Sequence, residues 1–189
     1  MIVRLDQQIF LYINSFNSPF WDEVMFAISS MLIWIPLYLA ILTFMGVRYK
    51  RKFLLILFFI ILGIFLSDKG SVHLFKNIFQ RLRPCHESDL EGLVHIVKGK
   101  CGGMYGFVSS HAANCFFTAT ISSLLIRKKW FSISMVCWAA IIGYSRIYLG
   151  VHYPGDIICG AAFGAFVGWC VFKLYGIAEV KVGGKRKYT

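Results

Sequence analysis

The sequence predicts an all-α protein, a polytopic transmembrane bundle of about five spans preceded by an N-terminal interfacial helix. Hydrophobic residues make up 58% of the 189 residues and charged residues only 15%, whereas about a quarter of a soluble domain is charged. Long apolar stretches recur along the chain, and short basic runs separate them. We expect one membrane-embedded domain covering residues 1–189.

Residues 1–20 are predicted to form a helix that lies at the membrane surface. Leu5, Ile9, Ile13 and Phe16 recur at helical spacing among polar residues, which is typical of an interfacial amphipathic helix. An ordinary helix packed against the bundle would have the same pattern. The segment lacks the basic start, apolar centre and cleavage site of a signal peptide, so we expect none.

Apolar stretches long enough to cross a bilayer follow this helix. Four of them are residues 24–47, 53–72, 106–126 and 154–176. A fifth, residues 130–148, is weaker because it contains three serines and an arginine.

The last predicted span carries three glycines at four-residue spacing, Gly160, Gly164 and Gly168. A row of small residues lets another helix approach closely. We expect this face to pack within the chain, and dimerisation through it is the less favoured alternative.

The basic runs predict the orientation of the spans. Runs at 48–52, 127–129 and 181–187 fall on one side if five spans alternate in direction, and the positive-inside rule makes that side cytoplasmic. The 73–105 loop then lies outside, and residues 177–189 form a basic cytoplasmic tail. The net charge of +11 does not indicate nucleic-acid binding, because the basic residues cluster between apolar stretches.

Three polar clusters fall on the outer side, and the first follows the second span. Lys76 and Arg83 are seven residues apart, so both lie on one face if the segment is helical, and Arg81 would point elsewhere. Pro84 would end that helix. Two cations on one face suit a dianionic phosphate, although a solvated basic stretch would contain the same residues.

The second cluster, Ser109-Ser110-His111, opens the third span. A helix start has free N–H groups and a positive dipole end, so an anion can bind there. Ser109 adds a hydroxyl, and His111 can titrate near neutral pH. The alternative is a serine N-cap followed by a histidine that reaches the membrane surface.

The third cluster bridges the fourth and fifth spans. His152 and Asp156 are four residues apart at the start of a span, where an aspartate can orient an imidazole. Arg146 offers a planar fork for phosphate oxygens. A structural His–Asp pair is the alternative, but charged groups near lipid are costly and more often functional.

Together these clusters resemble the motifs of the type 2 phosphatidic acid phosphatase family, whose site is shared with vanadium haloperoxidases. The first family motif is matched at Lys76, Arg83 and Pro84, and the third at Ser145, Arg146, His152 and Asp156. The second is matched at Ser109 and His111 and departs at Val108 and Ser110, where the family has Pro and Gly.

The resemblance implies a role for each matching residue. His152 would attack phosphorus and form a phosphohistidine, Asp156 would orient it, and His111 would act as general acid and then general base. The phosphoryl oxygens would be held by Lys76, Arg83, Ser109 and Arg146 with amides near Ser110. No metal or other cofactor is needed, because side-chain cations fill that role.

Two cysteines, Cys85 and Cys101, lie in the predicted outer loop, while the other four fall within spans. An oxidising exterior favours a Cys85–Cys101 disulfide over free thiols. A zinc site using both cysteines with His86 and His95 is the other possibility, but its spacing is not a familiar one.

The resemblance implies an integral-membrane lipid phosphatase in the bacterial inner membrane with a periplasmic active site. The Val-Ser-Ser-His-Ala-Ala-Asn segment and the outer-loop cysteines resemble lipid A phosphatases, so lipid A phosphate is the favoured substrate. Undecaprenyl diphosphate is the close alternative, and phosphatidylglycerol phosphate is another. A lipid phosphotransferase would use the same phosphohistidine. The alternative that is not an enzyme is a non-catalytic membrane protein.

Overall fold

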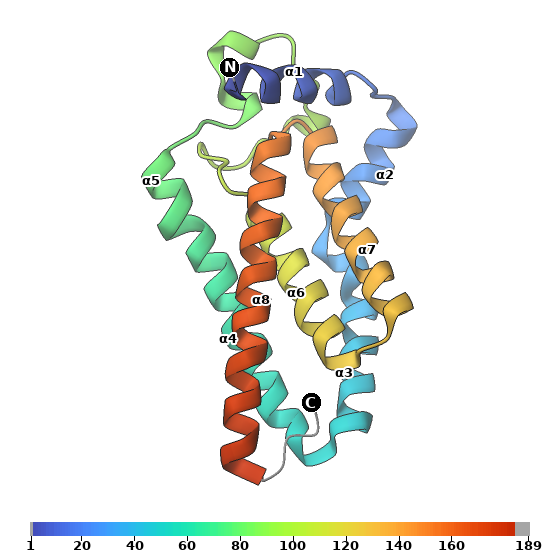
Figure 1. Cartoon of the computed structure of the whole chain (residues 1–189). Helices are drawn as coiled ribbons and strands as arrows, with labels where there is room; N and C mark the ends of the chain where they lie inside the picture. Colours follow the sequence, from blue (N-terminus) through green and yellow to red (C-terminus); the bar gives the residue numbers. More distant parts are fainter. Residues whose placement is uncertain (1, 184–189) are drawn as a thin grey trace.

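The computed structural model describes residues 2–183, and every regular element within that range is helical (Figure 1). The α-helices are α1 (Ile2–Asn14), α2 (Pro19–Ser29), α3 (Ile35–Tyr49), α4 (Phe53–Gly70), α5 (Asn77–Phe79), α6 (Ser110–Ile126), α7 (Lys129–Tyr148) and α8 (Pro154–Gly183). This confirms the all-α class. The predicted tail residues Lys185, Arg186 and Lys187 lie outside the described residues.

Helices long and apolar enough to cross a membrane confirm a polytopic bundle. They are Met31–Phe79, Lys129–Tyr148 and Pro154–Lys181. The first contains both α3 and α4, joined by a 3₁₀ turn at Lys50–Lys52. Helix α6 is shorter, at 17 residues, and nine of its side chains are buried, so it forms the centre of the bundle.

Helix α1 lies across one end of the bundle (Figure 1). Phe10 is fully buried and its ring meets that of Tyr153 at a centroid distance of 5.4 Å. Of the predicted apolar stripe, Leu5, Ile9 and Phe16 are exposed, whereas Ile13 packs against the same cluster as Phe10. The helix therefore packs through Phe10 and Ile13 and leaves the rest of the stripe uncovered, which suits a bilayer surface.

The first predicted span is broken. Ser30 has an extended conformation (φ −76°, ψ 129°) and separates α2 from a 3₁₀ turn at Met31–Trp34 and then α3. Pro36 lies in the first turn of α3, where its missing N–H costs nothing. Further inside a continuous 24–47 helix, the same proline would have removed a backbone hydrogen bond.

The helix that was expected to carry Lys76 and Arg83 as far as Pro84 ends earlier, at Phe79. Helix α4 continues through a π-helical turn at Ser71–Lys76 into α5, and Gln80 then adopts a left-handed conformation (φ 47°). Arg83 follows in an extended segment (φ −73°, ψ 156°). The expectation that Lys76 and Arg83 share one helix is therefore wrong.

Helices α6 and α8 pack through the predicted glycine face. A Cβ on Gly160 would lie 2.7 Å from the carbonyl oxygen of Ser109, and one on Gly164 would overlap the carbonyl of Ala113. Only glycine permits this approach, and it places the first turn of α8 against the start of α6. The glycine face is thus used within the chain.

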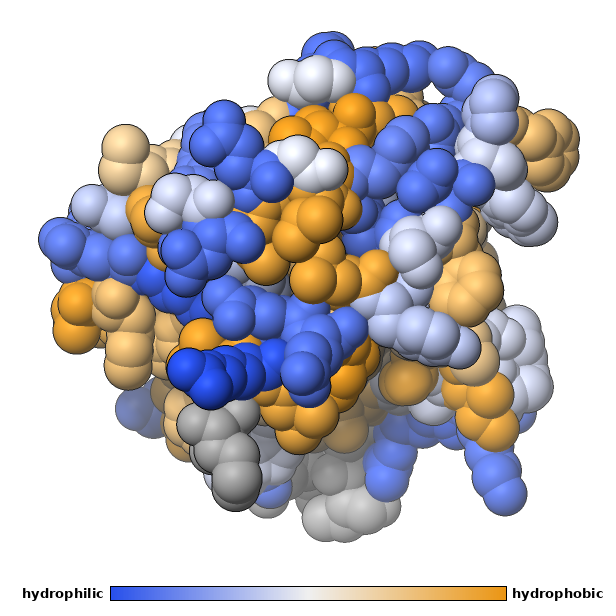
Figure 2. Space-filling view, turned by 90° about the horizontal axis from the view of Figure 1, so that it is seen from above, coloured by the Kyte–Doolittle hydropathy of each residue, from blue (hydrophilic) through white to orange (hydrophobic). Residues whose placement is uncertain are grey.

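The end of the bundle that carries α1 has a surface of mixed polarity. Seen from above, polar side chains spread over this face with apolar side chains between them (Figure 2). At the opposite end, the ammonium of Lys52 contacts the buried carboxylate of Glu179 at 2.7 Å.

Candidate active site

His152 and Asp156 form a buried pair beneath α1. His152 lies in the short connection before α8, and Asp156 lies in the first turn of α8. The Nδ1 atom of His152 is 3.3 Å from Oδ2 of Asp156. The backbone N–H of Tyr153 donates to the same oxygen at 3.0 Å. Both residues are at most 1% exposed.

The other ring nitrogen of His152 faces Arg83. Its Nε2 is 3.1 Å from Nη1 of Arg83. A guanidinium can only donate, so Nε2 is the acceptor and Nδ1 carries the proton that points to Asp156. Burial, helped by the positive charges of Arg83 and Arg146, holds the pKa of His152 well below its usual value. The imidazole is therefore neutral, and its Nε2 lone pair points toward the Arg83 guanidinium.

Arg83 and Arg146 approach the site from different elements. The backbone N–H of Arg83 donates to the carbonyl of Met104 at 3.1 Å, which fixes the extended segment. Nη1 of Arg146, on α7, donates to the hydroxyl of Ser29. Among the described residues, Nε of each arginine is buried without a hydrogen-bond partner. Buried unpartnered donors are rare, and these two suit an anion.

The start of α6 supplies hydroxyl groups. The hydroxyl of Ser109 accepts from the N–H of Ala112 at 3.4 Å, so this serine caps α6. The N–H of Ser109 donates to the carbonyl of Asp156 at 3.1 Å. Nζ of Lys76 is 2.9 Å from the hydroxyl of Ser110. The second cluster thus caps α6 and also lies next to the His152–Asp156 pair.

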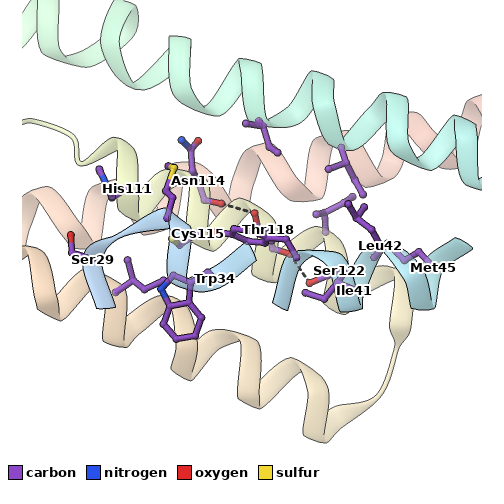
Figure 3. A pocket seen from close by; sticks show the side chains of 16 residues that line it. Ser29, Trp34, Ile41, Leu42, Met45, His111, Asn114, Cys115, Thr118 and Ser122 are labelled. Atoms are coloured by element: carbon purple, nitrogen blue, oxygen red, sulfur yellow. Dashed lines mark hydrogen bonds between the residues drawn. The ribbon is translucent and has the colours of Figure 1, made fainter. Parts of the chain in front are cut away.

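His111 occupies the first turn of α6 and stands between the polar site and an apolar cavity. It lies within electrostatic range of His152 and the site cations. The cavity of about 230 Å³ is lined mainly by α3, α4 and α6, and Ser29 and Ile142 also border it. Figure 3 shows His111 and Ser29 at one end, with Leu42 and Met45 at the other.

Two residues of this region were missed from the sequence. Arg81 was expected to point elsewhere, but its Nη1 is 3.0 Å from Oδ1 of Asp156 and its Nη2 is 2.8 Å from Oδ2 of Asp6. The left-handed turn at Gln80 redirects the chain, and this is why helical spacing gave the wrong direction. No local pattern marks Asp6, which lies on α1.

The structure joins Cys85 and Cys101 in a disulfide, with their Cα atoms 6.0 Å apart. His86 lies beside them. His95, the fourth member of the alternative zinc site, is directed instead at Asp22, 3.0 Å away. The disulfide ties the segment after Arg83 to the segment before α6.

Comparison with known proteins gives a consistent picture. A family model described as the PAP2 superfamily matches residues 52–178. A lipid A 4'-phosphatase from Bacteroides thetaiotaomicron is 41% identical over 170 residues, covering 89% of this chain and 76% of that protein. One from Porphyromonas gingivalis is 35% identical, with 92% and 74% covered.

A solved structure resembles the whole arrangement. It is the transmembrane PAP2-type phosphatidylglycerolphosphate phosphatase from Bacillus subtilis, with a TM-score of 0.69 and 25% identity. The match covers 98% of this chain and 89% of that chain.

Proposed function

This chain belongs to the PAP2 superfamily and is a membrane lipid phosphatase, and from that premise we propose that it hydrolyses lipid A 4'-phosphate through a phosphohistidine at the periplasmic face of the inner membrane. The observation that carries the proposal is the arrangement around His152. Nε2 faces the Arg83 guanidinium at 3.1 Å while Nδ1 faces Asp156 at 3.3 Å. A neutral, oriented imidazole beside fixed cations is what nucleophilic attack on a phosphoryl group requires.

In the first step, the Nε2 lone pair of His152 forms a bond to phosphorus and the bond from phosphorus to the lipid oxygen breaks. Protonated His111 donates its proton to that oxygen, so the lipid leaves as an alcohol. Asp156 stabilises the positive charge that develops on the ring of His152. Arg83, Arg146 and Lys76 offset the negative charge on the phosphoryl oxygens.

In the second step, neutral His111 takes a proton from water, and the water oxygen forms a bond to phosphorus. The bond between phosphorus and Nε2 breaks and inorganic phosphate is released. This sequence regenerates both histidines and requires no metal ion, since the side-chain cations supply the electrostatic stabilisation.

The cavity and the relatives both support the proposed lipid class. The cavity reaches His111 and Ser29 and is lined mainly by apolar side chains of three helices, which suits an acyl chain attached to a headgroup at the site. The relatives with 41% and 35% identity are both named as lipid A 4'-phosphatases. These matches favour lipid A 4'-phosphate over undecaprenyl diphosphate.

Phosphate release from a substrate panel tests the proposal. Purified protein in detergent micelles is given lipid A, undecaprenyl diphosphate or phosphatidylglycerol phosphate. We expect release from lipid A to be fastest and His152→Ala to abolish it. Retained activity in His152→Ala would defeat the mechanism, and faster hydrolysis of another lipid would replace the substrate.

Two further measurements test the finer parts. Enzyme quenched in alkali, where a phosphorus–nitrogen bond is stable, should retain labelled phosphate on His152 and should lose it on acidification. Adding an acceptor lipid should leave the yield of free phosphate unchanged if the enzyme is a hydrolase. A membrane-impermeant thiol reagent should label Glu91→Cys in intact spheroplasts and should leave Lys128→Cys unlabelled. The opposite labelling would invert the proposed orientation.

A further inference from the structure

We propose that Asp6 and Arg81 are positioning residues for the reaction and make α1 part of the active-site support, an inference that rests on the proposed function. A chain of short contacts connects α1 to the attacking histidine. It runs from the Asp6 carboxylate through the Arg81 guanidinium to Asp156, and from Asp156 to His152. Neither Asp6 nor Arg81 touches the reacting nitrogen.

The geometry fixes both oxygens of Asp156. Oδ1 accepts from Nη1 of Arg81 at 3.0 Å, while Oδ2 accepts from the N–H of Tyr153 and faces His152. A carboxylate held at both oxygens cannot rotate about its terminal bond. The direction in which it holds Nδ1–H, and hence the direction of the Nε2 lone pair, is thereby set.

The charges require this arrangement as well. Asp156 is 0% exposed, and a buried carboxylate without a cation is strongly disfavoured. Arg81 supplies that cation, so Asp156 can stay ionised and accept the Nδ1 proton. The guanidinium of Arg81 also lies over the Tyr153 ring, 4.0 Å from its centroid, and this contact fixes its plane.

Asp6 anchors the outer end of the chain of contacts. One of its oxygens accepts from Nη2 of Arg81 at 2.8 Å, and the other accepts from the N–H of Gly155 at 2.8 Å. That N–H is one of the free donors at the start of α8. A Cβ on Gly155 would lie 2.7 Å from Asp6, so glycine permits the carboxylate to reach the helix start beside Asp156.

Steady-state kinetics of three variants in detergent test the proposal. We expect Arg81→Gln to lower kcat about tenfold to a hundredfold, as outer-shell partners typically do, with KM within about twofold. Asp6→Asn keeps an acceptor for Gly155 but loses its charge, and should lower kcat about threefold or more. Because both act through one chain of contacts, the double variant should match Arg81→Gln within about twofold.

Inhibition by vanadate and by phosphate separates positioning from loss of folding. Vanadate must bond to an aligned Nε2, whereas phosphate needs only the cations. We expect inhibition by vanadate to weaken about as much as kcat falls in both single variants, and inhibition by phosphate to stay within about twofold. Arg81→Lys should recover part of the kcat lost in Arg81→Gln.

Controls on the same face make the outcome decisive. Glu23→Gln and Lys98→Gln remove an exposed ion pair of 2.8 Å and should retain full activity. If Arg81→Gln does not fold, Asp6→Asn alone decides the question. A kcat within about twofold of the wild type in folded variants, or equal weakening of vanadate and phosphate inhibition, would overturn the inference. Activity that survives His152→Ala would instead overturn the proposed function.

Discussion

Two pairs of helices in this bundle pack in different ways. Helices α6 and α8 meet through glycines so closely that a Cβ at Gly164 would overlap the backbone of α6. Helices α3 and α4 diverge from their shared turn (Figure 1), and the apolar cavity lies between them and α6. The proposed catalytic residues lie at the starts of the closely packed helices α6 and α8. The more open pair, α3 and α4, borders a cavity that an acyl chain can enter.

The difference follows from what each pair must do. Phosphoryl transfer needs groups held to within a fraction of an ångström, and backbone-to-backbone packing provides that. A lipid tail needs volume and apolar walls, not fixed contacts. The following variants test this division, from the largest expected effect to the smallest.

Gly164→Leu should break the tight pair. The added side chain has no space between α8 and the carbonyl of Ala113, so we expect a loss of about 3 kcal/mol or more in stability and near-complete loss of phosphate release. Thermal unfolding and activity in detergent measure both. Gly176→Leu lies on the same helix where a Cβ meets nothing within 4 Å, and should behave like the wild type.

The Cys85–Cys101 disulfide tests whether the 73–105 loop belongs with the rigid part of the bundle. The bridge closes a loop of 16 residues, so Cys85→Ser should lower stability by about 3 kcal/mol and reductant should have the same effect on the wild type. Thermal unfolding with and without reductant measures this. Cys137→Ser, at an exposed free cysteine, serves as the control, and equal shifts in both variants would contradict the assignment.

Thr118→Trp should fill the apolar cavity that α3 and α4 border. Thr118 lines the cavity, and an indole there should raise KM for a long-chain lipid about tenfold, or about 1.4 kcal/mol. A short-chain phosphate ester should be hydrolysed as before. Ile61→Trp, on the exposed face of α4, is the matched control. A fall in kcat for both substrates would show that the residues around the cavity support the catalytic groups as the closely packed helices do.

The smallest expected effect is the change in stability with pH that the titration of His152 causes. Its pKa in the folded protein is lowered by burial and by neighbouring cations, so the unfolded chain binds the proton first as the pH falls. The contribution of His152 to stability is therefore full well above pH 6.5 and decreases as the pH falls toward and below that value. Between pH 7.5 and 6.0 we expect His152 to contribute a loss of about 1 kcal/mol. His152→Asn should lack this part of the pH dependence in thermal unfolding curves.

Much of the site could be predicted from the sequence because its residues come in short, spaced motifs. The pairing of His152 with Asp156 depends on a four-residue spacing at the start of a helix, which local geometry determines. The three clusters were placed on one side by the alternation of spans. The structure brings Lys76, Arg83, His111 and Arg146 near that pair, while their catalytic roles remain predictions.

Other features depend on contacts that no local pattern encodes. Arg81 was assigned the wrong direction because Gln80 ends the helix early. Asp6 was missed because its partners, Arg81 and Gly155, lie 75 and 149 residues away.

The sequence by itself determined the helical class, the order of the spans, the glycine face and the spaced cationic and histidine motifs. These follow from periodicity and composition, which are local properties of the chain. The tertiary structure decided the break at Ser30, the cavity beside His111 and the link from α1 to Asp156. Each of these depends on which distant surfaces meet when the apolar faces are packed, and that is a property of the whole fold.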